Sequence, residues 1–292
     1  MLPLRWATAL PFVCLPLVSQ GADSKRAPLV LESFIDGSGP SIVMIGGGTR
    51  GADEFIPHAS IFAKNYRVVR LQTLNISRAQ QKQPLPADYS IAMESEAVGE
   101  TLNRLNLRES AHFVGHSLGA LIALQFALNH PGRVRTLTLA EPPAFWAPEE
   151  TELQHTPDMH AMYELLLTLG PETQPTDDQW IRFRCLLGEC GLKPPDPGDA
   201  RAQEWAARRD ALRGLSAVAQ MKVDRKRLTG FRKPVLMVTG DSTVSFHRRI
   251  DEILAAQFPA VERLDLPGTH AAVVTSRDEF VEGLRAFIGR HR

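Results

Sequence analysis

The sequence has no excess charge of either sign. Its 292 residues contain 33 Lys and Arg and 33 Asp and Glu, so the formal net charge at pH 7 is zero. Basic residues occur in short, scattered groups such as 225–227, which are typical of solvated helix faces. A nucleic-acid-binding protein needs a basic surface stripe, and we therefore predict that nucleic acid is not a partner.

Cysteine is also scarce, with three residues in the whole chain. Cys185 and Cys190 could form a disulfide in an exported protein, but the sequence is equally compatible with two buried free thiols. No group of His, Cys, Asp and Glu has the spacing of metal ligands. We therefore predict no metal site.

Long apolar runs are missing, apart from one near the N-terminus. Arg5 precedes an apolar stretch over residues 6–18, and small polar residues follow before Ala22. This order is typical of a secretory signal peptide over residues 1–22, and the stretch is too short to span a bilayer comfortably. We expect a secreted or periplasmic protein without a membrane span after processing. If the segment is not a signal, the alternative is a cytoplasmic protein.

The chain does have a regular alternation of strand-like and helix-like segments. The strand-like segments cover residues 29–35, 41–46, 66–72, 111–115, 134–140, 234–240 and 261–267. The helix-like segments cover residues 53–64, 90–106, 118–129, 246–257 and 277–289. This alternation predicts an α/β fold with a mostly parallel central sheet and helices on both faces.

One interval, residues 145–231, contains no convincing strand. It holds three helix-like segments, 158–170, 177–188 and 199–215, separated by Pro-rich stretches. We therefore predict a helical cap inserted into a core made of residues 28–144 and 232–292. Apolar residues of the cap could line a substrate cavity or pack the cap onto the core.

The pentapeptide GHSLG, residues 115–119, follows a predicted buried strand and opens a predicted buried helix. Such a turn raises the Ser117 hydroxyl above the sheet at a helix N-terminus, where developing negative charge is favoured. Gly115 and Gly119 are small because the turn brings backbones close together. With this elbow, the chain resembles the α/β-hydrolases, and the resemblance extends over about residues 29–291.

The resemblance implies a catalytic triad with Ser117 as the nucleophile. His270, in a G-x-x-H loop after the last strand, matches the family's proton carrier. The position where many members have the acid is Thr243, which is not acidic. We favour Glu141, at the carboxyl end of an earlier strand, and keep Asp241 as the alternative, because active residues gather at carboxyl ends of strands.

The resemblance also implies an oxyanion hole made of two backbone N–H groups. Leu118, after the nucleophile, supplies one of them. The glycine-rich loop of residues 43–51 supplies the other: Ile45 stands for the family's histidine, Gly46 for its glycine, and Gly47 is the expected donor, with Gly48 as the alternative. A dinucleotide-binding loop would require an acid at the end of the next strand, and residues 68–75 contain none.

These residues predict a cofactor-free serine hydrolase that cleaves a carboxylic ester or related acyl bond of a small, apolar substrate through an acyl-enzyme. Enzymes of the same fold that use an aspartate nucleophile do not match Ser117. A C–C bond hydrolase, lactonase, thioesterase or perhydrolase would keep the serine and stays open. A non-catalytic relative that binds a small ligand is the alternative from another functional class.

Overall fold

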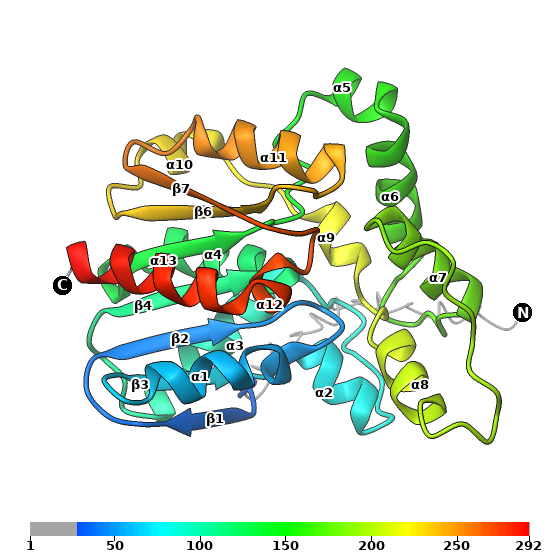
Figure 1. Ribbon diagram of the computed structural model, residues 1–292, viewed down its shortest axis with the longest axis horizontal. Coiled ribbons are helices and arrows are strands. Elements are labelled where there is room, and N and C mark those ends of the chain that lie inside the picture. Colours follow the sequence, from blue (N-terminus) through cyan, green and yellow to red (C-terminus); the bar gives the residue numbers. More distant parts are fainter. Residues whose placement is uncertain (1–27, 292) are drawn as a thin grey trace, which may run out of the picture.

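A seven-stranded sheet forms the centre of the computed structural model, which describes residues 28–291 (Figure 1). The strand order is β1-β3-β2-β4-β5-β6-β7, and only the β1–β3 pair is antiparallel. The mostly parallel sheet that the sequence predicts is therefore confirmed. The predicted signal peptide, residues 1–22, lies outside the described residues. The strands are β1 (Ser33–Asp36), β2 (Ser41–Ile45), β3 (Arg67–Leu71), β4 (Ala111–His116), β5 (Val134–Ala140), β6 (Val235–Gly240) and β7 (Val261–Leu266).

The inner strands β2 and β6 are buried on both faces, which explains why each reads as a continuous apolar run rather than an alternating one. On β2, Ile42 and Met44 join the apolar cluster on one face, and Val43 and Ile45 join the cluster on the other. The first face is covered by α1 (Ile56–Phe62), α12 (Ala272–Thr275) and α13 (Arg277–Arg290), and the second by α3 (Ile91–Arg104), α4 (Leu118–Asn129) and α11 (Ser245–Ala255) (Figure 1).

Two elements near the N-terminal end of the sheet differ from their predictions. The helix expected over 53–64 is split into a 3₁₀ turn, η1 (Gly51–Phe55), and α1, whose first turn contains Pro57. Proline is well placed in a first turn because the missing N–H would have no partner there. The strand expected over 29–35 is only β1, since the Leu31 N–H donates to the Thr101 hydroxyl, 2.8 Å away, instead of to a strand.

The segment between β5 and β6 consists of helices joined by loops. Its helices are α5 (Glu150–His155), α6 (Pro157–Leu167), α7 (Asp177–Leu186), α8 (Ala202–Asp210), α9 (Ser216–Gln220) and α10 (Arg225–Thr229). Residues 141–234, all of them described, contain no strand. In Figure 1, α5 to α8 stand together at the side to which the arrowheads of β2 and β6 point. This is the edge where the loops after the parallel strands gather.

The remaining helices are α2 (Leu74–Gln80) and the 3₁₀ turn η2 (Pro131–Arg133).

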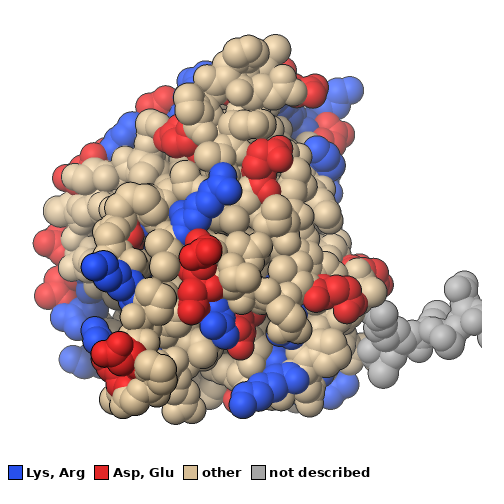
Figure 2. Space-filling view, turned by 90° about the vertical axis from the view of Figure 1, so that its right-hand side faces the viewer, with Lys and Arg blue, Asp and Glu red and all other residues tan. Residues whose placement is uncertain are grey.

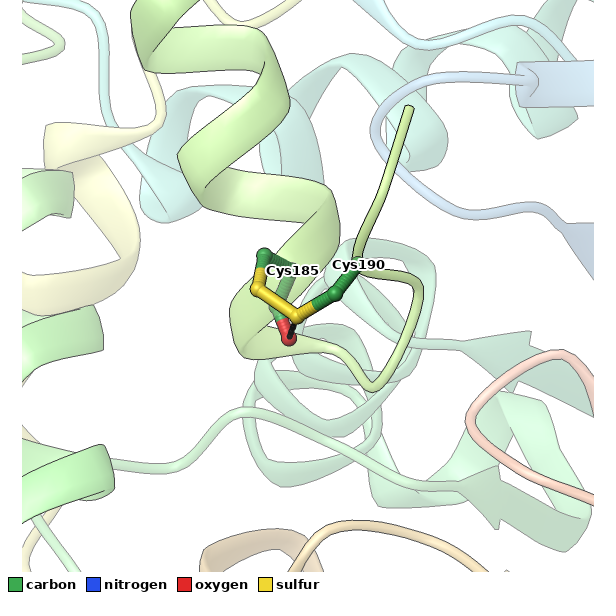
Figure 3. Close-up of a disulfide and its surroundings, with 2 residues drawn as sticks. All are labelled: Cys185 and Cys190. Atoms are coloured by element: carbon green, nitrogen blue, oxygen red, sulfur yellow. Dashed lines mark hydrogen bonds between the residues drawn. A yellow bond between two sulfur atoms is a disulfide. The ribbon is translucent and has the colours of Figure 1, made fainter. Parts of the chain in front are cut away.

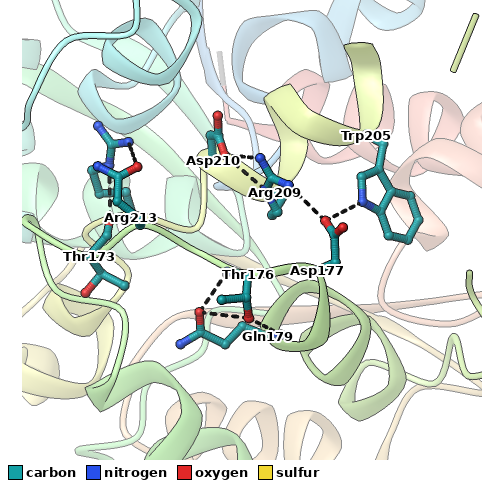
Figure 4. A network of polar contacts seen from close by, with 9 residues as sticks. Thr173, Thr176, Asp177, Gln179, Trp205, Arg209, Asp210 and Arg213 are labelled. Carbon is teal, nitrogen blue, oxygen red and sulfur yellow. Dashed lines mark hydrogen bonds and ion pairs between the residues drawn. The ribbon is translucent and has the colours of Figure 1, made fainter. Parts of the chain in front are cut away.

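Polar contacts join the cap helices to one another (Figure 4). The Asp177 carboxylate at the start of α7 accepts hydrogen bonds from the Trp205 ring N–H at 2.9 Å and from Arg209 at 3.0 Å, both on α8. Thr176 and Gln179 form a reciprocal capping box at the same helix end. These contacts join the start of α7 to α8, and the rings of Trp180 on α7 and Trp205 on α8 pack edge to face between the same two helices.

A disulfide joins Cys185, near the end of α7, to Cys190 in the following turn (Figure 3). Cys190 is exposed, so the alternative of two buried free thiols is wrong. The bond closes a six-residue segment that includes Leu187 and Glu189, and both side chains line an apolar cavity that Ser117 and His270 also line. The disulfide therefore constrains one wall of that cavity.

The surface on the cap side carries both signs of charge. Figure 2 shows Lys and Arg interspersed with Asp and Glu on this face, without a broad area of one sign. This pattern agrees with the zero net charge of the sequence. None of the described helices combines the length and the apolar character that crossing a membrane requires.

Candidate active site

Ser117 sits in a strained turn between β4 and α4. Its φ is 52° and its ψ is −121°, a backbone conformation that residues with a side chain rarely adopt. A Cβ on Gly115 would lie 2.4 Å from the Gly119 carbonyl oxygen, and one on Gly119 would lie 2.1 Å from the carbonyl oxygen of Ile45. Glycine is therefore required at both positions, as predicted. For Gly119, on α4, the close neighbours are backbone atoms of Ile45 and Gly46 at the end of β2.

His270 and Glu141 are joined by a hydrogen bond. The His270 Nδ1–H donates to the Glu141 carboxylate over 2.8 Å, and both side chains are buried. Glu141 follows β5 directly and has a φ of 43°, so a second strained backbone position orients a site residue. Within the described chain, neither the Ser117 hydroxyl nor the His270 Nε2 has a hydrogen-bond partner, and both residues line one cavity.

Two further donors hold the Glu141 carboxylate. Its Oε1 accepts the Gly240 N–H at 2.7 Å, and its Oε2 accepts the Thr243 hydroxyl at 2.8 Å. Burial alone would raise the pKa of Glu141, but the hydrogen bond and charge of His270, followed by His247 and Gly240, lower this pKa to about 2. Glu141 is therefore a carboxylate at neutral pH and can stabilise a positive charge on His270.

Asp241, the alternative acid, has a different role. Its exposed carboxylate accepts the Gly268 N–H at 3.0 Å and the Ser242 hydroxyl at 2.8 Å, and these contacts lower the pKa of Asp241. It makes no hydrogen bond to His270, both residues being described. Asp241 organises the turn after β6, and Glu141 alone of the two acids contacts the histidine.

The glycine loop after β2 lies against the elbow. The Gly47 N–H, the expected oxyanion donor, donates to the Glu54 carboxylate at 3.3 Å. The Gly48 N–H and the Leu118 N–H have no acceptor in residues 28–291. A Cβ on Gly48 would lie 3.4 Å from the Leu118 Cβ, so these two residues are neighbours. Gly48 is therefore better placed than Gly47 to share an oxyanion with Leu118.

Two buried histidines that sequence analysis did not single out flank His270. The His247 ring, on α11, stacks on the His270 ring with 4.4 Å between centroids, and the His116 ring lies 4.8 Å from it. Burial and the charge of His270 lower the pKa of His247 to about 3, so this ring is neutral at physiological pH. No sequence signal could have placed His247 here, since it reaches the site only through the packing of α11.

An apolar cavity of about 330 Å³ is lined by Ser117 and His270. The glycine loop, Ser117 and His270 form its floor, and core and cap side chains form its walls. These walls are largely apolar: Leu118, Phe145, Met162, Leu166, Phe183, Leu187, Leu215, Val218 and Phe246. A volume near the lower end of the range for ligand pockets fits a small substrate.

Three possible metal ligands also meet at the site. Ligand atoms of Glu141, His247 and His270 lie within 4.8 Å of one another, a cluster that sequence spacing did not predict. Glu141 and His270 already share a hydrogen bond, and Glu141 also accepts from Gly240 and Thr243. A metal ion here would have to displace these contacts, so the donor set fits a triad better than a metal centre.

Known proteins resemble this chain over most of its length. A family model described as alpha/beta hydrolase fold matches residues 40–165. The chain is 28% identical over 263 residues to the putative carbamate hydrolase RutD of Klebsiella pneumoniae, covering 85% of this chain and 92% of that protein. It is 26% identical over 266 residues to the pimeloyl-[acyl-carrier protein] methyl ester esterase of Aeromonas hydrophila, covering 87% and 97% respectively.

A solved structure shares the arrangement of strands and helices. The enol-lactonase from Burkholderia xenovorans LB400 matches with a TM-score of 0.58 and 20% sequence identity, over 89% of this chain and 96% of that one. At this level of identity the likeness concerns the fold.

Proposed function

Since the chain belongs to the α/β-hydrolase superfamily of enzymes, we propose that it is a serine hydrolase that cleaves a carboxylic ester or related acyl bond of a small, apolar substrate. The observation that carries the proposal is the convergence on one cavity of a strained, unpartnered serine and a histidine hydrogen-bonded to a buried carboxylate. The cavity's volume and apolar walls support the substrate class.

In the proposed mechanism, the Ser117 Oγ attacks the substrate carbonyl carbon and its proton passes to the His270 Nε2. The Glu141 carboxylate holds the His270 Nδ1–H and stabilises the imidazolium. The backbone N–H groups of Leu118 and Gly48 bind the oxyanion, because the Gly47 N–H is engaged by Glu54. His270 returns the proton to the leaving alcohol, and the acyl-enzyme forms.

Hydrolysis of the acyl-enzyme completes the proposed cycle. A water molecule gives a proton to the His270 Nε2 and attacks the acyl carbon. The second tetrahedral intermediate then breaks its bond to the Ser117 oxygen, which recovers the proton from His270 and releases the carboxylic acid.

The test is intact mass after treatment with a fluorophosphonate. The wild type should gain one adduct, and Ser117→Ala and His270→Ala should gain none, because each lacks one partner of the activated serine. Ser60→Ala is the matched control, since Ser60 is an exposed serine on α1 and should leave labelling unchanged. No adduct on a folded wild type would favour the ligand-binding alternative.

A panel of substrates then tests the acyl class. p-Nitrophenyl esters of increasing chain length report how much acyl chain the cavity accepts, and the names of the relatives add a methyl ester, a carbamate and a lactone to the panel. Faster turnover of short acyl chains than of long ones is the expected result for a cavity of about 330 Å³.

A further inference from the structure

Glu54 and His116 are two buried ionisable residues that the triad does not use. Glu54 comes from η1, His116 directly precedes Ser117, and each residue is 5% exposed. The His116 Nδ1 lies 2.6 Å from the Glu54 Oε1. Both side chains border the same cavity as Ser117 and His270. A buried acid and a buried base are therefore in contact beside Ser117 and His270.

The partners of His116 point to its charge. Its Nδ1 faces a carboxylate and its Nε2 lies 2.8 Å from the carbonyl oxygen of His270. A carbonyl oxygen only accepts, so the Nε2 carries a hydrogen, and the shifts in the two pKa values decide whether the proton between the Nδ1 and Glu54 belongs to the ring or to the carboxyl group. Burial opposes both charges, but the mutual attraction outweighs it: the pKa of Glu54 is lowered and the pKa of His116 is raised. The pair is therefore a carboxylate and an imidazolium.

Other ionisable groups face this pair from neighbouring elements. His58 on α1 lies within electrostatic range of both members, the charge of His270 acts on Glu54, and the charge of Glu141 acts on His116. The rings of His116 and His270 thus lie side by side between the two carboxylates, and the charges of Glu54 and Glu141 both raise the pKa of His116.

The pair connects two loops that are far apart in the sheet. The Glu54 Oε2 accepts the Gly47 N–H, and the His116 Nε2–H donates to the backbone of His270. The glycine loop follows β2 and the His270 loop follows β7, with β4, β5 and β6 between these strands. One continuous chain of hydrogen bonds therefore runs from the oxyanion loop, beneath the elbow, to the catalytic histidine.

We propose that Glu54 and His116 are positioning residues that fix the oxyanion loop and the His270 backbone relative to Ser117. The proposal rests on the proposed serine hydrolase function. Glu54 holds Gly47 so that the next N–H, that of Gly48, is turned to the oxyanion. His116 fixes the main chain of His270 while Glu141 fixes its ring. Glu54 thus acts on the backbone of His270 through His116, and Glu141 acts directly on the ring of His270.

The test compares fluorophosphonate labelling rates of the full-length wild type, Glu54→Gln and Glu54→Ala over a range of pH. Glu54→Gln keeps the shape but turns His116 neutral and weakens its contact with the His270 carbonyl, so labelling should slow by about 10-fold. Glu54→Ala releases both loops and should slow labelling by about 100-fold. Asp53→Asn, the exposed neighbouring acid on η1, is the matched control and should label like the wild type.

Two readouts separate positioning from a space-filling role. In Glu54→Gln the pH dependence of labelling should change, because the substitution removes the charges of both Glu54 and His116 beside His270. Nitrogen-15 NMR should show both ring nitrogens of His116 protonated in the wild type and only one in Glu54→Gln. A folded Glu54→Gln protein that labels at the wild-type rate with an unchanged pH dependence overturns the proposal. A wild type that takes no label instead overturns the hydrolase function on which the proposal rests.

Discussion

Glu141 and Thr243 together form the acidic side of the site: Glu141 contacts His270, and Thr243 holds the Glu141 carboxylate. Thr243 occupies the position where the resemblance expects the acid, and it donates its hydroxyl to the Glu141 carboxylate over 2.8 Å. β5 and β6 are neighbours in the sheet, so the ends of both strands reach the same point beside His270. The carboxylate that contacts His270 therefore comes from the end of β5, and the residue after the end of β6 supports it through a hydrogen bond.

Removing the charge of Glu141 should therefore be severe. We expect Glu141→Gln to slow fluorophosphonate labelling by about 10³-fold to 10⁴-fold, because the neutral amide neither fixes the His270 tautomer nor stabilises the imidazolium. Thermal unfolding of the variant checks that the fold is intact. Asp241→Asn is the control and should keep its rate, since asparagine can still accept the Gly268 N–H. A slow Asp241→Asn beside a fast Glu141→Gln would give the role to Asp241.

The sequence singled out Ser117, His270 and Glu141 but not Glu54 or His247. The first three each follow a predicted strand or fit a loop pattern, and the carboxyl ends of parallel strands meet at one edge. Glu54 and His247 lie on η1 and α11, and they reach the site only because these elements pack against the loops. No local pattern carries that information.

The elbow depends on how closely α4 approaches β2 and β4. A methyl group on Gly119 would lie 2.1 Å from the Ile45 carbonyl oxygen, a distance that backbone atoms cannot relieve without moving the helix. We expect Gly119→Ala to lower the free energy of unfolding by at least about 2 kcal/mol, measured by urea denaturation.

A second helical glycine supplies the matched comparison. Nothing lies within 4 Å of a Cβ on Gly289 in α13, so Gly289→Ala should raise the free energy of unfolding, by up to about 1 kcal/mol. The two substitutions are chemically identical and differ only in surroundings. A stable, active Gly119→Ala protein would contradict the close packing described for the elbow.

Element prediction succeeded where segments are long and failed where they are short. The sequence predicts helices over 158–170, 177–188 and 199–215; α7 and α8 lie within their ranges, and α6 begins one residue before its range. It misses α5, α9 and α10, which have five or six residues each. So short a helix has less than two turns, too few for a 3.6-residue period to stand out.

Glu94 is a buried acid that lies outside the candidate active site. Glu94 on α3 accepts the Leu74 N–H at 2.8 Å and the Tyr89 hydroxyl at 2.7 Å, both through Oε1. Burial raises the pKa of Glu94 to about 7 from an ordinary value of 4.5, although these hydrogen bonds act in the opposite direction. The folded protein therefore keeps a proton between pH 4.5 and pH 7 that the unfolded chain releases.

The free energy of unfolding should therefore decrease as the pH rises through this range, because the folded protein binds one more proton than the unfolded chain. Glu94 contributes about 3 kcal/mol to the free energy of unfolding below pH 4.5, and this contribution is lost as the pH rises to about 7. We expect the difference in free energy of unfolding between wild type and Glu94→Gln to fall by this amount across that window. Urea denaturation at pH 4.5, 6 and 7.5 measures it, and a difference that does not vary with pH would contradict the raised pKa.

Buried histidines act in the opposite direction and cancel in that comparison. Burial lowers the pKa of His112 to about 4 and the pKa of His247 to about 3. Below pH 6.5 the unfolded chain therefore binds protons at these two residues that the folded protein does not bind. Their contribution is complete above pH 6.5 and is lost as the pH falls toward 4 and 3. The variant and the wild type share both histidines, which makes Glu94 the only difference.

The sequence by itself determined the parallel sheet, the helical segment between β5 and β6, and the elbow at Ser117, because each depends on periodicity or on a local turn. Tertiary structure alone decided which acid contacts His270, which glycine N–H is free, and whether Cys185 and Cys190 are paired. These outcomes depend on distances between residues separated by five to 129 positions in the chain. Such distances are set by packing, and a linear pattern of residue types does not encode them to the ångström on which a hydrogen bond depends.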